Sequence, residues 1–157
     1  MALTAEDIRT DYPLPVYNYR VEIGSEAVAF SEVSGLSIAV ETITYKESPV
    51  ASGAPGPRVM HMPAQRTAPK ITLKKGIVRQ VSLKMLYDWI RTVQINQIEK
   101  KDIFVRLCDE KGAPVISWKV GNAFPTKLDA PTFDAKSNEA AIQSMELMAD
   151  YVSIEES

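Results

Sequence analysis

The chain has 157 residues, of which 45% are hydrophobic and 24% charged, a balance that is ordinary for one globular domain with its own core. The formal net charge of −2 excludes a basic field that would bind nucleic acid through its phosphates. A single cysteine, Cys108, excludes an internal disulfide and is typical of a reducing cytosol. We expect neither an N-terminal secretion signal nor membrane insertion, because the sequence shows no basic leader with an apolar run and no apolar stretch of membrane-spanning length.

The N-terminal part is predicted to hold an arm and short antiparallel strands. Residues 1–13 read as a polar arm that is ended by Pro13 and Pro15. Over residues 17–23, aromatic and β-branched side chains alternate with polar ones, the pattern of a half-buried strand. A turn at residues 24–25 and a break at residues 34–35 bound a short return strand that ends near Phe30.

The next strand changes the parity of its apolar side chains. Leu36, Ile38 and Val40 share one parity, whereas Ile43 and Tyr45 have the other. Because side chains alternate along a strand, this change predicts a β-bulge near residues 41–42.

Residues 47–69 contain seven prolines and glycines, which predicts a long loop rather than a helix or a central strand. The second half of this loop carries side-chain types that suit contacts. We expect it to order against a neighbouring subunit, and an ordinary exposed surface loop is the alternative. The candidate interface residues are Arg58, Met60, His61, Met62, Gln65 and Arg66.

One amphipathic helix is predicted after a strand at residues 70–74. Its apolar stripe consists of Leu83, Leu86, Tyr87, Ile90 and Val93. Ser82 is the expected N-cap, and Val81 is placed to form a hydrophobic staple with Leu86. A helix with one apolar stripe should lie across a sheet, and we expect its buried face beneath Trp118.

The C-terminal half is predicted to be antiparallel. Strands at residues 103–107 and 116–120 flank a hairpin turn at residues 109–112, where Gly112 suits a left-handed backbone. Residues 121–125 bend the chain, and residues 139–154 form one long final strand. The fold class from pattern alone is therefore mainly β and antiparallel, with one helix.

The sequence offers little for catalysis. Glycine-rich phosphate-binding motifs are missing, and a zinc site needs more ligands than Cys108 and His61. Those two residues could form a nucleophile pair, but nothing in the sequence orients either one, and a buried structural cysteine is favoured. Trp89 and Trp118 lie on apolar faces and are expected in the core rather than in a nucleic-acid stacking platform. We expect no catalytic residue, no cofactor and no metal.

Six segments, taken in their order and spacing, carry a family resemblance. They are Tyr-Pro-Leu-Pro at 12–15, Phe-Ser-Glu-Val-Ser-Gly-Leu at 30–36, Lys-Ile-Thr-Leu-Lys-Lys-Gly at 70–76, Tyr-Asp-Trp-Ile at 87–90, Glu-Lys-Lys-Asp at 99–102 and Trp-Lys-Val-Gly-Asn-Ala-Phe-Pro-Thr at 118–126. They resemble the inner-tube proteins of extracellular contractile injection systems, such as the Photorhabdus virulence cassettes and the Serratia antifeeding prophage. These proteins belong with the T-even phage tail-tube family, and the resemblance extends from about residue 12 to residue 154.

The resemblance implies an antiparallel β-sandwich or small barrel with one flanking helix, like the haemolysin co-regulated protein. Six copies would form a ring, and rings would stack into a hollow tube that sheath contraction drives into a target cell. The implied partners are further tube rings, the sheath, baseplate or spike adaptors and protein cargo, with no nucleic acid. Such a subunit would be made in the bacterial cytoplasm and released within a phage-tail-like particle for toxin delivery. The residues expected to support the fold are Phe30, Gly35, Leu36, Leu86, Trp89, Ile90, Trp118 and Phe124.

The segment at residues 47–69 departs from this resemblance, because it looks longer than in a repeating tube subunit. Extra residues at 48–57 leave two subtypes open, a repeating subunit and an initiator ring next to the spike. Two functions of other classes also remain open. One is a small monomeric binding module that uses residues 47–69, and the other is a hydrolase with a Cys108–His61 pair.

Overall fold

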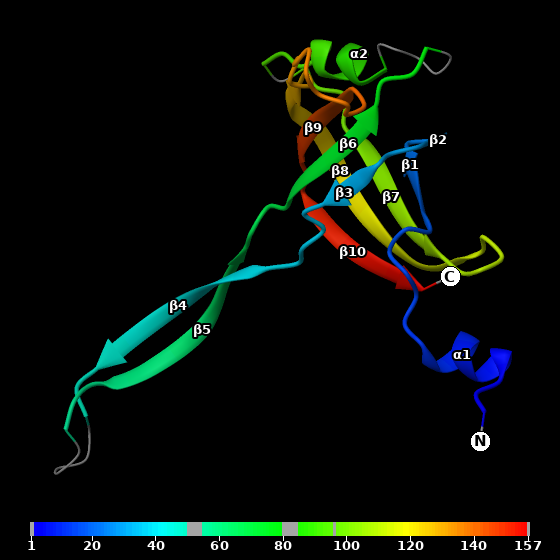
Figure 1. Ribbon diagram of the computed structural model, residues 1–157. Helices are drawn as coiled ribbons and strands as arrows, with labels where there is room; N and C mark the ends of the chain where they lie inside the picture. The colour runs from blue at the N-terminus through cyan, green and yellow to red at the C-terminus, as the bar shows by residue number, and fades with distance from the viewer. Residues whose placement is uncertain (1, 50–54, 80–84, 96, 157) are drawn as a thin grey trace.

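The computed structural model describes residues 2–49, 55–79, 85–95 and 97–156, and it shows a twisted antiparallel body from which a long hairpin projects (Figure 1). The elements in chain order are α1 (Ala5–Asp11), β1 (Tyr19–Ile23), β2 (Glu26–Val28), β3 (Glu32–Ser34), β4 (Val40–Glu47), β5 (Arg58–Arg66), β6 (Lys70–Gly76), α2 (Met85–Arg91), β7 (Lys101–Cys108), β8 (Pro114–Asp129), β9 (Ile142–Met148) and β10 (Tyr151–Glu156). The predicted class, mainly β and antiparallel, is confirmed.

An eight-stranded sheet forms the body, in the order β2-β1-β7-β8-β9-β6-β3, with β10 also paired to β8. β3 and β6 cross in front of β7 and β8 in Figure 1, so the sheet folds over itself. The two layers share one apolar core, because alternate side chains of each layer point toward the other. The most buried members of this core are Val21, Ile71, Leu73, Leu86, Ile103, Val120, Ala123, Met145 and Leu147.

The bend in β8 divides the sheet. The first half of β8 pairs with β7 and β10, and the second half pairs with β9. At the bend, Asn122 has a left-handed backbone with φ of 52°, and its N–H donates to an Asp102 carboxylate oxygen at 3.0 Å. The predicted bend at residues 121–125 is confirmed, although the strand continues through it to Asp129.

The single final strand predicted at residues 139–154 is wrong. The structure has two strands, β9 and β10, which separate at Ala149 and Asp150. Both pair with β8, one on each side of its bend, so the chain must turn between them. The Asp150 N–H donates to the Gly121 carbonyl oxygen at 3.0 Å and holds this turn against the bend.

The predicted N-terminal arm contains a helix, α1, that the sequence analysis missed. Thr4 and Asp7 form a capping box, in which each side chain accepts the other residue's backbone N–H at 3.1 Å. The hydrogen bond from the Thr4 backbone N–H, followed by that with the Thr4 side chain, lowers the pKa of Asp7. No residue of α1 is buried, and Arg9 approaches Glu110 of the body at 3.9 Å.

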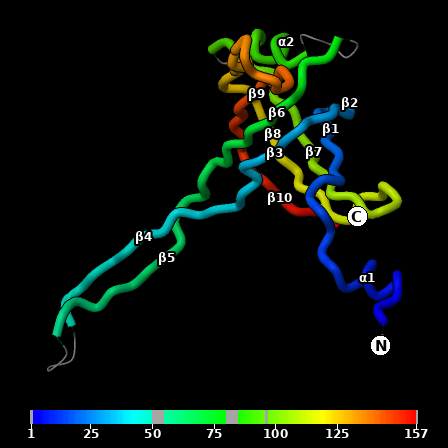
Figure 2. The backbone as a smooth tube through the Cα atoms, in the orientation of Figure 1, coloured from blue at the N-terminus to red at the C-terminus, as the bar shows by residue number. Residues whose placement is uncertain are grey.

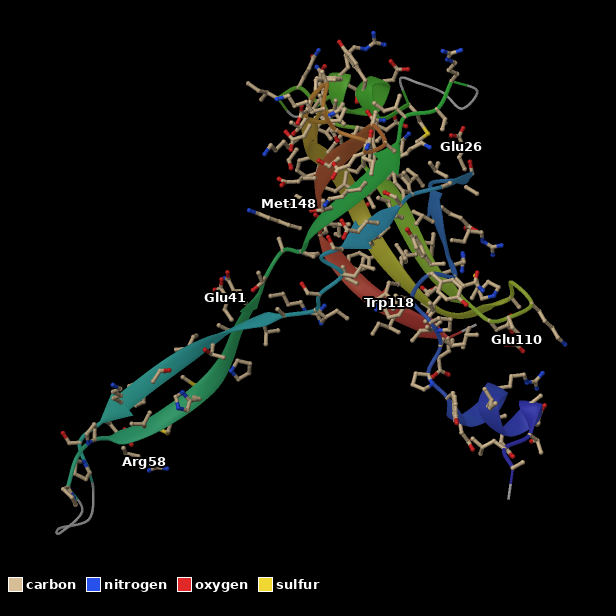
Figure 3. The ribbon with its side chains drawn as sticks, viewed as in Figure 1. Glu26, Glu41, Arg58, Glu110, Trp118 and Met148 are labelled. Atoms are coloured by element: carbon tan, nitrogen blue, oxygen red, sulfur yellow. The ribbon has the colours of Figure 1, made fainter. Side chains whose placement is uncertain are left out.

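The helix α2 packs on the body through the predicted Leu86, Trp89 and Ile90, but not through Tyr87 of the predicted stripe. Leu86 and Trp89 are buried, whereas Tyr87 is 48% exposed. The Trp89 indole N–H donates to the Glu99 carbonyl oxygen at 2.9 Å, which fixes the ring over the sheet end. Figure 3 places Trp118 at the other end of the body from α2, so the expected packing beneath Trp118 is wrong. The predicted N-cap, staple and first stripe residue (82, 81 and 83) lie outside the described residues.

The hairpin turn between β7 and β8 is confirmed. Gly112 has a φ of 79°, and its N–H donates to the Asp109 carbonyl oxygen at 3.0 Å. The Asp109 carboxylate accepts two further backbone N–H groups, those of Lys111 and Ala113, each at 2.9 Å. These bonds fold the connection locally, which is why the sequence alone predicted it.

Candidate assembly surfaces

β4 and β5 form a two-stranded antiparallel sheet, called the arm, that projects from the body (Figures 1 and 2). The prediction of a loop over residues 47–69 is therefore wrong for Arg58–Arg66, which is strand. Both strands of the arm are edge strands, and an edge strand tolerates the missing N–H of Pro63. The prediction that this segment is no central strand is confirmed.

The register of the arm is irregular near its base. Val40 lies opposite Arg66, while Thr42 lies opposite Pro63, so two residues of β5 face the single Glu41 of β4. The predicted irregularity near residues 41–42 is confirmed, but the extra residue belongs to β5. β4 itself begins at Val40, so Leu36 and Ile38 lie before the strand.

The two faces of the arm differ in chemistry, because directly paired residues share a face. One face carries the pairs Ile43–Met62 and Tyr45–Met60, and we call these four residues the apolar face. The other face carries Thr44, Lys46, Val59 and His61. On it, the Thr44 hydroxyl and His61 Nδ1 lie 3.1 Å apart.

All six candidate interface residues lie in β5, but the structure distributes them over both faces and along the length of the arm. Met60 and Met62 belong to the apolar face, and His61 belongs to the other. Arg58 lies far from the body, where it pairs with Glu47 at 3.7 Å (Figure 3). Gln65 and Arg66 lie at the base. Ile43 and Tyr45, which the sequence analysis did not select, complete the apolar face, and their shared parity was the signal.

The arm lacks a core of its own. Ile43, Tyr45 and Met62 are 50%, 48% and 44% exposed, although each is a large apolar side chain. An isolated two-stranded hairpin is marginally stable in water, and a contiguous exposed apolar face marks an interaction surface. The arm is therefore built to be covered by another surface.

The chain enters the arm through Gly35, which only glycine can occupy without strain. Its φ is 88°, and a Cβ added there would collide with the carbonyl oxygen of Lys70 on β6. The neighbouring Leu36 packs against the body core. Gly35 thus lets the chain pass close to the backbone of β6 just before the arm begins.

The body also presents open sheet edges. Within the described part of the chain, β2 pairs only with β1, β3 only with β6, and β10 only with β8. Unpaired backbone N–H and C=O groups along such edges readily pair with another chain.

The residues considered for chemistry do not come together. Cys108 is buried at the end of β7, and its thiol lies 3.7 Å from the Arg106 carbonyl oxygen, whereas His61 is exposed on the arm. Among the residues described, no group of three or more His, Cys, Asp or Glu side chains could hold a metal ion. In the same residues, no helix is both long enough and apolar enough to span a membrane.

Among the other residues expected to support the fold, Leu86 and Trp89 belong to the buried core. Phe30, Leu36, Ile90 and Trp118 are partly buried and pack against it. Phe124 is half-buried next to Lys100, whose amino group lies 5.5 Å from the ring centroid.

Comparison with known proteins assigns this fold to a class. Residues 15–153 match the family described as T4-like virus tail tube protein gp19. No curated protein matches the chain. The chain therefore belongs to the T4-like tail tube family, whose members are structural tube proteins.

Solved structures narrow the class to contractile injection systems. A chain of the PVC sheath–tube complex in the extended state, an extracellular contractile injection system, is 39% identical, with 99% of this chain and 100% of that chain covered and a TM-score of 0.88. A chain of the anti-feeding prophage tube-terminating cap is 45% identical, with both chains fully covered and a TM-score of 0.83. A chain of the PVC sheath/tube terminator is 41% identical, with 93% and 99% covered and a TM-score of 0.82. The protein is a homologue of the tube and tube-terminator subunits of these machines and has a structural tube role.

Proposed function

We propose that this chain assembles into closed hexameric rings that stack into the inner tube of a contractile injection machine. The observation that carries the proposal is the arm, whose apolar face has no partner among the described residues of its own chain. Six copies agree with the six-fold symmetrised anti-feeding prophage baseplate, of which one chain is 19% identical and shares this fold with a TM-score of 0.67. We infer no enzymatic activity, because no arrangement of the described residues supports catalysis.

Ring closure is supported by the open edges of β2, β3 and β10. Joining an edge of one copy to an edge of the next pairs the exposed backbone groups and removes a site of uncontrolled aggregation. A head-to-tail contact of this kind closes into a ring when the rotation from one copy to the next is a whole fraction of 360°. The arm is then free to contact the adjacent ring, with Arg58, Met60, His61, Met62, Gln65 and Arg66 as interface residues.

The proposed partners follow from the same relatives. In PVC a sheath and a tube form one complex, and we infer that a sheath surrounds tubes of this chain. Baseplate or spike adaptors would meet the tube end, and protein cargo would occupy the lumen. The subunit is made in the bacterial cytoplasm and then becomes part of an extracellular particle.

We propose the repeating subunit rather than the initiator ring. Chains of the sheath–tube complex, the tube-terminating cap and the tube terminator are 39%, 45% and 41% identical, against 19% for a chain of the baseplate, so the likeness lies with the tube away from the baseplate. Residues 50–54 of the extra segment at 48–57, which raised the initiator alternative, lie outside the described residues.

Assembly is tested by negative-stain imaging and sedimentation of the purified chain over a wide concentration range. Rings or tubes are expected, and a monodisperse monomer throughout would refute the proposal and favour the monomeric binding module.

Replacing residues 48–57 with Asn-Gly tests the subtype. Glu47 and Arg58 are directly paired, so a two-residue type I′ turn can join them. The repeating subunit predicts that this variant still stacks, since the apolar face is intact. Long tubes from the shortened chain alone, absent with the original chain, would identify the segment as a device that limits growth and the chain as an initiator.

A further inference from the structure

One end of the body core is open. Opposite the end that α2 covers, a groove of about 420 Å³ lies between β1, β3, β7 and β8. Ser31 and Glu32 lie at the groove, and the rest of its lining, which defines the groove, consists of Val16, Tyr19, Val33, Leu36, Val105, Leu107 and Trp118. Tyr19, Val33, Leu36 and Trp118 are only partly buried, although they pack against the core. Covering this groove would complete the core at the end that α2 does not reach.

We propose that the apolar face of the arm from a second copy of this chain occupies the groove. The inference rests on the proposed function, because it names where the arm of one tube subunit binds another. The chain's own arm cannot fill the groove. It departs from Gly35 and Leu36 at the groove's border and extends away from the body (Figures 1 and 2).

Two independent features of the arm match the groove. The first is chemistry, since the arm offers two methionines, a tyrosine and an isoleucine in two adjacent cross-strand pairs on one face. Methionine and tyrosine adapt well to irregular apolar surfaces at interfaces. With this face in the groove, the opposite face, which carries Thr44, Lys46, Val59 and His61, points away from the groove.

The second feature is the backbone. The groove is bordered by β3, which in the described structure pairs only with β6 and so leaves its other edge open. The arm is a two-stranded sheet with an open edge on each strand. Adding an arm strand to the edge of β3 would pair both sets of backbone groups while the side chains enter the groove, which is the strand-addition mode of recognition.

The contact has a direction, because the arm and the groove are different surfaces of one chain. Each copy donates one arm and accepts one arm, so the interaction propagates from subunit to subunit without a symmetric dimer. This property is what a stacked tube requires of its repeating contact.

Disulfide trapping between two variants that each gain one cysteine tests the contact. Ile43→Cys, on the apolar face, is mixed in equal amounts with Val33→Cys, in the groove, and the assembled mixture is oxidised mildly. The matched control replaces Ile43→Cys with Thr44→Cys, the adjacent residue on the other face. The native Cys108 is 4% exposed, so the unmodified chain measures background linkage.

We expect at least about tenfold more covalent heterodimer from the Ile43→Cys mixture than from the Thr44→Cys mixture, because a disulfide tolerates only a narrow range of Cβ separations. Mass spectrometry of the linked peptides identifies the two positions. Equal yields from both mixtures would overturn the inference. So would efficient linkage of Val33→Cys to Ile8→Cys instead, which would place the N-terminal helix of a neighbour in the groove.

Imaging of the same samples separates this inference from the proposed function. Rings or tubes without Ile43–Val33 linkage would refute the groove as the arm's site and leave the tube function intact. A sample that remains monomeric, with no linkage, would refute both.

Discussion

Gly35→Ala is the substitution for which the structure predicts the sharpest effect. Gly35 has a φ of 88°, where a residue with a Cβ costs about 1–2 kcal/mol relative to glycine. The added Cβ would also collide with the carbonyl oxygen of Lys70 and lie 3.1 Å from its carbonyl carbon. Both atoms belong to backbone of β6, which is held by the fully buried Ile71, so they cannot move aside easily.

The collision adds its own penalty to the dihedral one. Forcing extra atoms into a packed site costs about 1–3 kcal/mol, so the total loss of unfolding free energy is about 2–5 kcal/mol. Gly24→Ala is the matched control, because Gly24 has a φ of 61° and nothing within 4 Å of its added Cβ. This control should lose only the dihedral part, about 1–2 kcal/mol.

Urea denaturation of the unassembled subunit, followed by circular dichroism, measures both losses. Gly35→Ala should also reduce tube formation more than Gly24→Ala does, since the arm departs at Gly35. Equal losses of unfolding free energy for the two variants would show that the backbone relaxes freely, and the argument that the close crossing demands glycine would fail.

Two further predictions concern the core and pH. Leu86→Ala should lower the unfolding free energy by about 2–5 kcal/mol in a denaturant titration, because Leu86 is only 1% exposed. The control Tyr87→Ala, on the exposed side of α2, should change the unfolding free energy little. A near-zero loss for Leu86→Ala would show that α2 is peripheral to the core. Burial and, secondarily, the nearby Glu32 raise the pKa of Tyr19 above its ordinary value of 10.0. The neutral phenol is therefore the form the fold favours, and its contribution is present below pH 10.0 and is lost as pH rises through the raised pKa. Tyr19→Phe removes the hydrogen bond to the Phe30 carbonyl oxygen at 2.6 Å, so the variant should have a lower unfolding free energy near neutral pH. Above pH 10.0, the unfolding free energy of the variant should fall less than that of the original chain in denaturant titrations. Equal falls in the two chains would show that ionisation of Tyr19 does not cause the loss of stability.

Local patterns in the sequence determined those elements that depend on residues within one short segment. Alternation predicted β1, β6 and β7, and Asp109 with Gly112 predicted the turn between β7 and β8, because those hydrogen bonds join residues within one short segment. The family resemblance also came from the sequence alone, because it depends on the order of short segments along the chain.

Tertiary structure alone decided which strands pair and which surfaces remain open. Composition made residues 58–66 look like loop, but pairing with β4 turns them into a strand despite Pro63. The bend in β8 divides the predicted last strand, since its two parts pair on opposite sides of that bend. The apolar face of the arm and the groove depend on cross-strand register and on contacts between residues far apart in the chain. Periodicity shows only that a strand has two faces, and which face stays exposed is set by what the rest of the chain leaves uncovered.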